Sequence, residues 1–431
     1  MKKLIVEGNN RLNGQICISG AKNASLPILM ASILIGGKSK IFNVPSVADI
    51  TTTIELLTHL GASLEINNNT VDGKKLFTVD TTTINTVEAP YEIVSKMRAS
   101  FWVLGSLLSR FGEAKVSLPG GCAIGPRPCD IYIDVLEQMG VNIKVENGYV
   151  IAKAKSKNKK LKGADVTLRL PSVGATHNTI MAATLAVGQT TIRNAAKEPE
   201  IVDLCNYLIN AGADISGMGT ETIVINGVDK LYDNEYKVMG DRIEAFTYMV
   251  ASAITQGDLI LDGIDFNSTL KTPIEILKTI GLEFDQISND KIRVFYDKPL
   301  KPTNIVTQFF PGFPTDTQAS IMALLGKVPG ISTIEEMIFE NRFMHVPELN
   351  RLGANINVSG NLATIVGVNN YSGASVMASD LRAGMALVLA GLAANGVTEI
   401  SRIYHIDRGY ENFVGKLSGG GAKMEVVDDK E

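Results

Sequence analysis

The sequence predicts an α/β protein built from six copies of one repeat. Three observations lead to this fold class: strand-like and helix-like stretches alternate, one glycine recurs about every 70 residues, and a second glycine precedes it by about 24 residues. The recurring glycines are Gly61, Gly140, Gly212, Gly281, Gly353 and Gly421, and the preceding ones are Gly37, Gly112, Gly188, Gly257, Gly330 and Gly396. Each recurring glycine is expected to follow a helix and to take a positive φ.

The third repeat gives the expected order of elements. Residues 166–170 alternate as a strand, and residues 176–187 form a continuous apolar helix. Residues 190–193 form a second strand, 199–211 an amphipathic helix and 214–216 a third strand. Each repeat is therefore predicted to read strand, helix, strand, helix, strand.

Six repeats in 431 residues divide naturally into two domains of three. The third repeat gives way to the fourth near residues 231–235. We therefore predict a first domain over residues 21–231, and a second domain made of residues 1–20 and 232–431. Each is long enough to bury a core of its own.

The composition, with 45% hydrophobic and 20% charged residues, is that of an ordinary soluble globular protein. A formal net charge of −4 argues against a nucleic-acid surface. The N-terminus lacks the apolar core of a signal peptide, and the longest apolar stretch, residues 383–394, is too short to span a bilayer. Four cysteines without disulfide or metal spacing suit a reducing compartment, so we expect a cytoplasmic protein without membrane insertion.

Cys122 lies in a loop rich in glycine and proline, residues 118–128, which excludes a helix or a central strand. The two glycines of the second repeat are about four residues further apart than those of the other repeats, so this loop is an insertion on the repeated scaffold. Positive charge from Arg127 lowers the pKa of a nearby thiol, which makes Cys122 a candidate acid or nucleophile. A small, buried apolar cysteine is the equally weighted alternative.

A charged residue opens the apolar helix in five of the six repeats, at nearly the same distance before the glycine. These residues are Lys22, Arg98, Arg242, Asp316 and Arg382. A cation at a helix N-terminus destabilises the helix by about 0.3–1 kcal/mol. Four such cations indicate an external anion that compensates for them, which predicts a phosphate-rich site. Solvated charge at helix edges is the alternative for any one of them. His345 and His405 are expected to be structural rather than bases.

Several segments in the same order resemble the enolpyruvyl transferase family. They are residues 19–24, 97–100, 118–122, 313–316, 339–349 and 402–410, and the similarity extends over essentially the whole chain. The resemblance implies a pair of inside-out α/β barrels, each of three repeats, with the active site in the cleft between the domains. It also implies that the N-terminal strand packs with the second domain.

The resemblance further implies a reaction. The enolpyruvyl group of phosphoenolpyruvate passes to the 3-hydroxyl of UDP-N-acetylglucosamine, and phosphate is released in the first committed step of peptidoglycan synthesis. No cofactor and no metal are implied. We expect a monomer, and we expect the epoxide fosfomycin to alkylate Cys122.

The family's site residues carry over to matching positions. Cys122 is similar to the family's proton donor, which also forms a covalent adduct with phosphoenolpyruvate. Asp316 is similar to the residue that contacts the attacking hydroxyl and serves as its base. The phosphate and carboxylate of phosphoenolpyruvate are expected at Lys22, Arg127 and Arg408, with Arg382 alongside. The nucleotide sugar is expected at Asn23, Arg98, Arg127, Pro128, Cys129, Asp130, Ile131, Ser172, Val173, Gly174 and Ile338, with Trp102 either near that site or in the core.

Two alternatives stay open. One is the shikimate-pathway enzyme of the same fold, against which the inserted Cys122 loop argues. The other is a non-catalytic protein that binds a UDP-sugar, although a binder needs no acid–base pair.

Two departures from the family also stand out: Leu170 and Pro171 occupy a place where the family often has a lysine, and residues 176–179 differ from the common versions.

Overall fold

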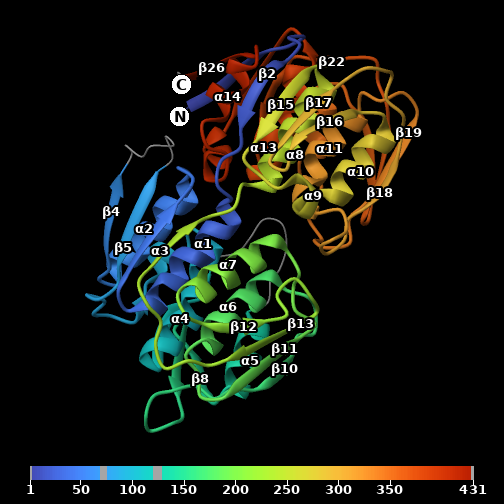
Figure 1. Ribbon diagram of the computed structural model, residues 1–431. Helices are drawn as coiled ribbons and strands as arrows, with labels where there is room; N and C mark the ends of the chain where they lie inside the picture. The colour runs from blue at the N-terminus through green and yellow to red at the C-terminus, as the bar shows by residue number, and fades with distance from the viewer. Residues whose placement is uncertain (1, 68–74, 120–128, 429–431) are drawn as a thin grey trace. The chain divides into compact units, whose positions relative to one another are not determined.

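The computed structural model describes residues 2–67, 75–119 and 129–428. Within these residues the chain forms two compact lobes, each with its own hydrophobic core (Figure 1). The first lobe comprises residues 20–67, 75–119 and 129–239, and the second comprises residues 2–19 and 240–428. The chain leaves the first lobe at residues 239–240, later than the boundary expected after residue 231. The reason is that β14 (Asn234–Lys237) still pairs with a strand of the first lobe.

The first lobe contains three four-stranded sheets among its described residues. In spatial order they are β14–β3 (Lys38–Phe42)–β5 (Leu76–Asp80)–β4 (Ser63–Asn67), then β6 (Glu88–Ala89)–β7 (Glu113–Ser117)–β9 (Tyr149–Ala154)–β8 (Val141–Glu146), then β10 (Asp165–Thr167)–β11 (Gln189–Arg193)–β13 (Thr222–Asn226)–β12 (Asp214–Ser216). The helices are α1 (Lys22–Ala31), α2 (Ala48–His59), α3 (Tyr91–Val94), α4 (Val103–Phe111), α5 (Asp130–Gln138), α6 (Val173–Ala183) and α7 (Pro199–Asn210), with 3-10 helices η1 (Ser32–Ile35) and η2 (Arg98–Trp102).

The second lobe also contains three four-stranded sheets in the described part of the chain. They are β2 (Asn13–Cys17)–β15 (Asp258–Asp262)–β17 (Lys291–Phe295)–β16 (Glu283–Ser288), then β18 (Asn304–Val306)–β19 (Ile331–Glu335)–β21 (Leu362–Val366)–β20 (Asn355–Ser359), then β23 (Ser375–Met377)–β25 (Val397–Ser401)–β1 (Lys2–Glu7)–β26 (Lys423–Asp428). A short pair, β22 (Tyr371–Ser372) and β24 (Ala394–Asn395), stands apart. The helices are α8 (Arg242–Ile254), α9 (Phe266–Thr269), α10 (Lys271–Ile280), α11 (Gln318–Leu325), α12 (Val346–Arg351), α13 (Leu381–Leu392) and α14 (Phe413–Gly419), with 3-10 helices η3 (Thr315–Thr317) and η4 (Ile403–Arg408).

All six four-stranded sheets share one pairing pattern. In the orders given above, the first two strands are parallel and the other neighbours are antiparallel. The α/β class is therefore confirmed. The order of elements that the sequence predicted for a repeat omitted one strand. In the third repeat, β12 is followed by β13, which returns antiparallel to it.

One largely buried helix comes from each repeat: α1, α4, α6, α8, α11 and α13. In the first lobe α4 contacts both α1 and α6, and in the second lobe α8, α11 and α13 contact one another. All the residues of α8 are buried, which suits a helix that is largely apolar around its whole circumference. The strands instead alternate buried and exposed residues, as in β11 and β21, so each sheet covers the helices with one face.

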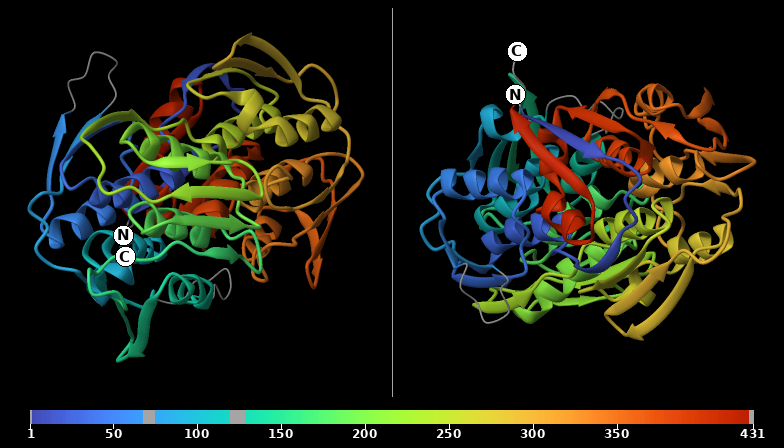
Figure 2. Two further views of the ribbon diagram at one scale, coloured as in Figure 1. Left: turned by 60° about the horizontal axis from the view of Figure 1, so that its bottom comes forward. Right: turned by 90° about the horizontal axis from the view of Figure 1, so that it is seen from above.

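The recurring glycines behave as predicted. All six have positive φ, between 81° and 113°. The N-terminal strand also lies where it was expected, because β1 pairs with both β25 and β26 of the second lobe, as the blue strand beside the red ones in Figure 2 shows. The third repeat differs in detail: α6 starts at Val173, before the expected residue 176, since the side chain of Ser172 caps it.

Asp203 of α7 supports the end of the first lobe and makes its stability depend on pH. Its carboxylate accepts hydrogen bonds from Tyr236 Oη at 2.7 Å and from the backbone N–H of Met239 at 3.2 Å. Burial raises the pKa of Asp203 from 3.8 to about 6, although these two hydrogen bonds oppose the rise. Because the pKa of Asp203 is higher in the folded state than in the unfolded state, this carboxyl group makes its full contribution to the stability of the folded state below pH 3.8. That contribution is lost as the pH rises through about 6.

We therefore expect Asp203→Asn to gain stability relative to the wild type as the pH rises from 4 to 8. Asparagine carries no charge, and its Oδ1 can still accept the N–H of Met239. Its Nδ2 can donate to Tyr236 Oη, whose hydroxyl then donates to the backbone carbonyl of residue 203 alone. A pKa difference of about two units corresponds to at most about 3 kcal/mol in the free energy of unfolding. Urea unfolding of both proteins across this pH range measures the difference, and a difference that stays constant with pH would contradict the assignment.

Candidate active site

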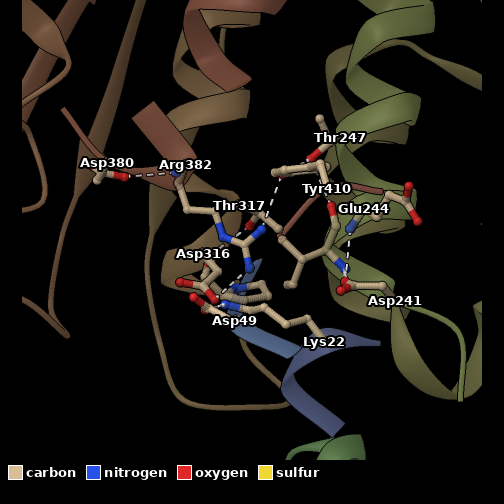
Figure 3. A network of polar contacts seen from close by, with 12 residues as sticks. Lys22, Asp49, Asp241, Glu244, Thr247, Asp316, Thr317, Asp380, Arg382 and Tyr410 are labelled. Atoms are coloured by element: carbon tan, nitrogen blue, oxygen red, sulfur yellow. Dashed lines mark hydrogen bonds and ion pairs between the residues drawn. The ribbon is translucent and has the colours of Figure 1, made fainter. Parts of the chain in front are cut away.

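Lys22 and Asp49 form a nearly buried ion pair in the first lobe. Lys22 is the first residue of α1, and its Nζ lies 3.0 Å from Oδ2 of Asp49 in α2 (Figure 3). The lysine and aspartate side chains are only 12% and 6% exposed. Asp49 thus compensates for a cation at a helix N-terminus, a role that the sequence had suggested for an external anion. Asn23, the next expected site residue, is half-buried in the same helix turn.

A second group of expected residues gathers where η2, α5 and α6 begin. Helix α6 contacts both η2 and α5. Burial raises the pKa of Cys129 just before α5, and nearby Arg98 at the start of η2 opposes the rise. An added Cβ at Gly174, in the first turn of α6, would lie 2.1 Å from Tyr132 Oη and 2.8 Å from Trp102 Nε1, so any larger residue would require these two side chains to shift.

Other residues of this group have partners within the first lobe. Asp130 accepts a hydrogen bond from Arg169 at 2.5 Å, and this contact lowers the pKa of Asp130. The side chain of Ile131 is buried in the hydrophobic core, so only its backbone suits the expected role in binding. Val173 packs partly against the same core. Leu170 is 38% exposed, so this departure from the family places an apolar side chain on the surface.

Asp316 is the centre of the polar cluster in the second lobe (Figure 3). Its Oδ1 lies 2.5 Å from Nη2 of Arg342, and its Oδ2 lies 3.2 Å from Nη2 of Arg382. The two guanidinium side chains are 6% and 7% exposed, whereas the carboxylate is 30% exposed. The carboxylate is therefore the more accessible member of a group that carries two positive charges and one negative.

Arg382 is anchored at both of its ends. Asp380 caps α13 by accepting the backbone N–H of Arg382 at 2.8 Å, and Nη1 of Arg382 lies 3.3 Å from Tyr410 Oη. Tyr410 shares a further hydrogen bond of 2.8 Å with Thr247 of α8. Burial alone would lower the pKa of Arg382, but Asp316 and Tyr410 outweigh it and raise this pKa, so the guanidinium stays charged.

Sequence reasoning missed Arg342 and Asp49 as members of these clusters. Arg342 lies within the resembling segment 339–349, and nothing local marks it as the partner of a residue 26 positions away. His345 of the same segment is buried, and burial lowers its pKa to about 4, so this histidine is neutral at pH 7. Arg408 ends η4, which packs against α13. Ile338 donates its backbone N–H to Glu336.

Three expected site residues, Cys122, Arg127 and Pro128, lie outside the described residues. Within the described ranges, no helix has the length and apolar character needed to cross a membrane.

The comparisons with known proteins agree with one another. Residues 6–417 match the family described as EPSP synthase (3-phosphoshikimate 1-carboxyvinyltransferase). The chain is 49% identical to UDP-N-acetylglucosamine 1-carboxyvinyltransferase 2 of Carboxydothermus hydrogenoformans and 50% identical to UDP-N-acetylglucosamine 1-carboxyvinyltransferase of Trichlorobacter lovleyi, each over 429 residues and 100% of both chains.

Solved structures show the same fold. The enolpyruvyl transferase NikO from Streptomyces tendae superposes with a TM-score of 0.88 at 26% identity, covering 99% of each chain. EPSP synthase from Acinetobacter baumannii superposes with a TM-score of 0.76 at 19% identity, covering 99% of this chain and 100% of the other, and so supports the fold alone. The chain belongs to the enolpyruvyl transferase family.

Proposed function

We propose that this protein transfers the enolpyruvyl group of phosphoenolpyruvate to the 3-hydroxyl of UDP-N-acetylglucosamine and releases phosphate, the first committed step of peptidoglycan synthesis. One observation carries the proposal: Asp316, a partly exposed carboxylate, lies between two buried arginines, in a chain about half identical over its full length to proteins named for this reaction. A base beside fixed positive charge suits a reaction between a hydroxyl and an anionic enol.

The finer architecture is part of the proposal. Each lobe is taken as an inside-out α/β barrel of three repeats, which the shared strand pairing of the six sheets and the buried helices support. The active site is placed in the cleft between the two domains. The protein is taken to act as a cytoplasmic monomer, with no cofactor or metal in the reaction.

The chemistry proceeds by addition and then elimination. Cys122 gives its thiol proton to C3 of phosphoenolpyruvate while the sugar 3-oxygen bonds to C2 and passes its own proton to Asp316. In the second step the bond from C2 to the phosphate oxygen breaks, C3 gives a proton to the Cys122 thiolate, and the double bond between C2 and C3 forms again. The departing phosphate takes up the proton held by Asp316, which restores both groups. Phosphate and the enolpyruvyl ether of the nucleotide sugar are the products. Cys122 also forms the covalent adduct that the resemblance implies.

Cationic residues hold the two anionic groups of phosphoenolpyruvate. We assign the phosphate and carboxylate to Lys22, Arg127 and Arg408, with Arg382 alongside. Arg382 is paired with Asp316, so an arriving anion competes with that carboxylate for the guanidinium. Binding of the anion thereby weakens the ion pair between Arg382 and Asp316. The Asp316 carboxylate is then a better acceptor for the proton of the hydroxyl.

The nucleotide sugar is assigned to the remaining expected residues. In the first lobe, the clustering of Arg98, Cys129 and Gly174 where three helices start supports this assignment. Helix starts present unpaired N–H groups that suit a diphosphate. Ile338 is assigned to the sugar nucleotide from the second lobe.

A phosphate-release assay tests the proposed function. We expect phosphate release from phosphoenolpyruvate when UDP-N-acetylglucosamine is the acceptor, and none with shikimate 3-phosphate or without acceptor. Release with shikimate 3-phosphate alone would support the shikimate-pathway alternative. Binding of the UDP-sugar without any release would support the non-catalytic alternative.

A further inference from the structure

Glu336 is a buried carboxylate that the proposed chemistry does not use. It directly follows β19 and is only 3% exposed. Its partners are all neutral donors: Oε2 accepts the hydroxyl of Thr315 at 2.9 Å, and Oε1 accepts the backbone N–H groups of Ile338 at 2.9 Å and Phe339 at 3.1 Å. Among the described residues, no lysine, arginine or histidine forms an ion pair with it. A buried charge held only by neutral donors is costly, which argues for a specific role.

The three donors come from two loops that both carry candidate site residues. Thr315 directly precedes Asp316 in η3. Ile338, the expected contact to the nucleotide sugar, and Phe339 belong to the loop after β19. Glu336 therefore joins the turn that carries the base to the loop that contacts the sugar.

Arg342 closes the same connection from the other side. Its guanidinium carbon lies 5.5 Å from the centre of the Phe339 ring, and its Nη2 lies 2.5 Å from Oδ1 of Asp316. Glu336, Thr315, Asp316, Arg342 and Phe339 thus form a closed ring of contacts. Two sets of contacts therefore hold Asp316 relative to the loop after β19. One runs through Glu336 and Thr315, and the other runs through Arg342 and Phe339.

We propose that Glu336 is a positioning residue that fixes Asp316 at the correct distance from the sugar hydroxyl. This inference rests on the proposed function. A carboxylate fits the task because both of its oxygens only accept, whereas the amide of glutamine would turn a donor toward one partner. Because a displacement of about 1 Å at a reacting group can cost about 100-fold in rate, small changes in this ring should lower turnover.

Thr315→Val gives the cleanest test, since it removes one hydroxyl and keeps the side chain's shape. We expect kcat in the phosphate-release assay to fall about 10-fold with little change in KM, and Thr315→Ser to retain wild-type kcat. The kcat of Glu336→Gln should lie between that of the wild type and that of Glu336→Ala. The matched control is Thr333→Val, which also removes one hydroxyl hydrogen bond, from Thr333 to Asn304 on the outer sheet, and should leave kcat unchanged.

A double-mutant cycle separates positioning from a general structural role. If Glu336 and Thr315 act through Asp316, Thr315→Val should cause no further loss in an Asp316→Asn background. Equal fold losses in both backgrounds, or a Thr315→Val enzyme as active as Thr333→Val, would overturn the proposal.

Hydrogen exchange tests whether Glu336 connects η3 to the loop after β19, and it does not depend on an activity measurement. We expect Glu336→Ala to accelerate exchange at the amide of Thr317, which donates to Pro314 within η3, as well as at Ile338 and Phe339. An unchanged Thr317 amide would overturn the proposal. A wild-type protein that releases no phosphate with UDP-N-acetylglucosamine would instead overturn the proposed function, and the exchange result would still decide whether the connection exists.

Discussion

Asp316→Asn is expected to lower kcat about 10²- to 10⁴-fold, because the amide cannot accept the proton of the sugar hydroxyl. The substitution also removes the carboxylate that pairs with both Arg382 and Arg342. Arg382 then meets less competition for the anionic substrate, so the KM for phosphoenolpyruvate should stay the same or decrease. Steady-state kinetics with each substrate varied in turn measure both constants.

Asp285→Asn is the matched control for this prediction. Asp285 also pairs with an arginine of its own sheet, since Nη1 of Arg293 lies 3.1 Å from its Oδ2, but this pair is on the surface. Surface ion pairs contribute little, so activity and stability should both be retained. An Asp316→Asn enzyme with kcat within about threefold of the wild type would show that another group removes the proton. A folded protein with a much higher KM for phosphoenolpyruvate would contradict the competition for Arg382.

The fold was largely predictable because its signals are local. A glycine that must take positive φ after a helix marks each repeat, and Gly281 and Gly421 show that geometry as clearly as Gly61 does. The chain leaves the first lobe later than predicted because β14 pairs with β3, and these strands lie almost two hundred residues apart in sequence. No local pattern marks such a contact.

The candidate site was predictable in its charges but not in its pairings. The regular placement of Lys22 and Arg382 at helix starts pointed to an anionic ligand. The structure adds that carboxylates of the chain, Asp49 and Asp316, already balance these two cations. Which acid meets which base depends on how separate repeats pack, and a periodic pattern within each repeat holds no information on that. Glu336 was missed for the same reason.

Loss of the Cys122 thiol is expected to have a second large effect. Cys122→Ala should lower kcat by several orders of magnitude, since no proton donor remains for C3 of phosphoenolpyruvate. Cys122→Asp should keep much of the activity, because a carboxylic acid can donate the same proton. The phosphate-release assay with UDP-N-acetylglucosamine measures both variants. An inactive Cys122→Asp enzyme would show that the thiol acts as a nucleophile and not only as an acid.

Alkylation distinguishes Cys122 from the other cysteines of the chain. The thiolate opens an epoxide by forming a bond from sulfur to carbon while the carbon–oxygen bond breaks and the oxygen takes up a proton. Burial raises the pKa of Cys129, and it raises that of Cys205 to about 12, so neither should react near neutral pH. Cys17 is exposed, and Cys17→Ala is therefore the control that should leave labelling by fosfomycin intact.

Peptide mass spectrometry should find the fosfomycin adduct on Cys122 alone, and Cys122→Asp should resist the epoxide while it still turns over substrate. That combination separates the two functions of the thiol, because proton donation survives the substitution and nucleophilic attack does not. An adduct on Cys129 would show that the positive charge of Arg98 outweighs burial at that thiol. The reactive thiolate would then lie where α5 begins, among the residues assigned to the nucleotide sugar, and the assignment of the acid to Cys122 would fail.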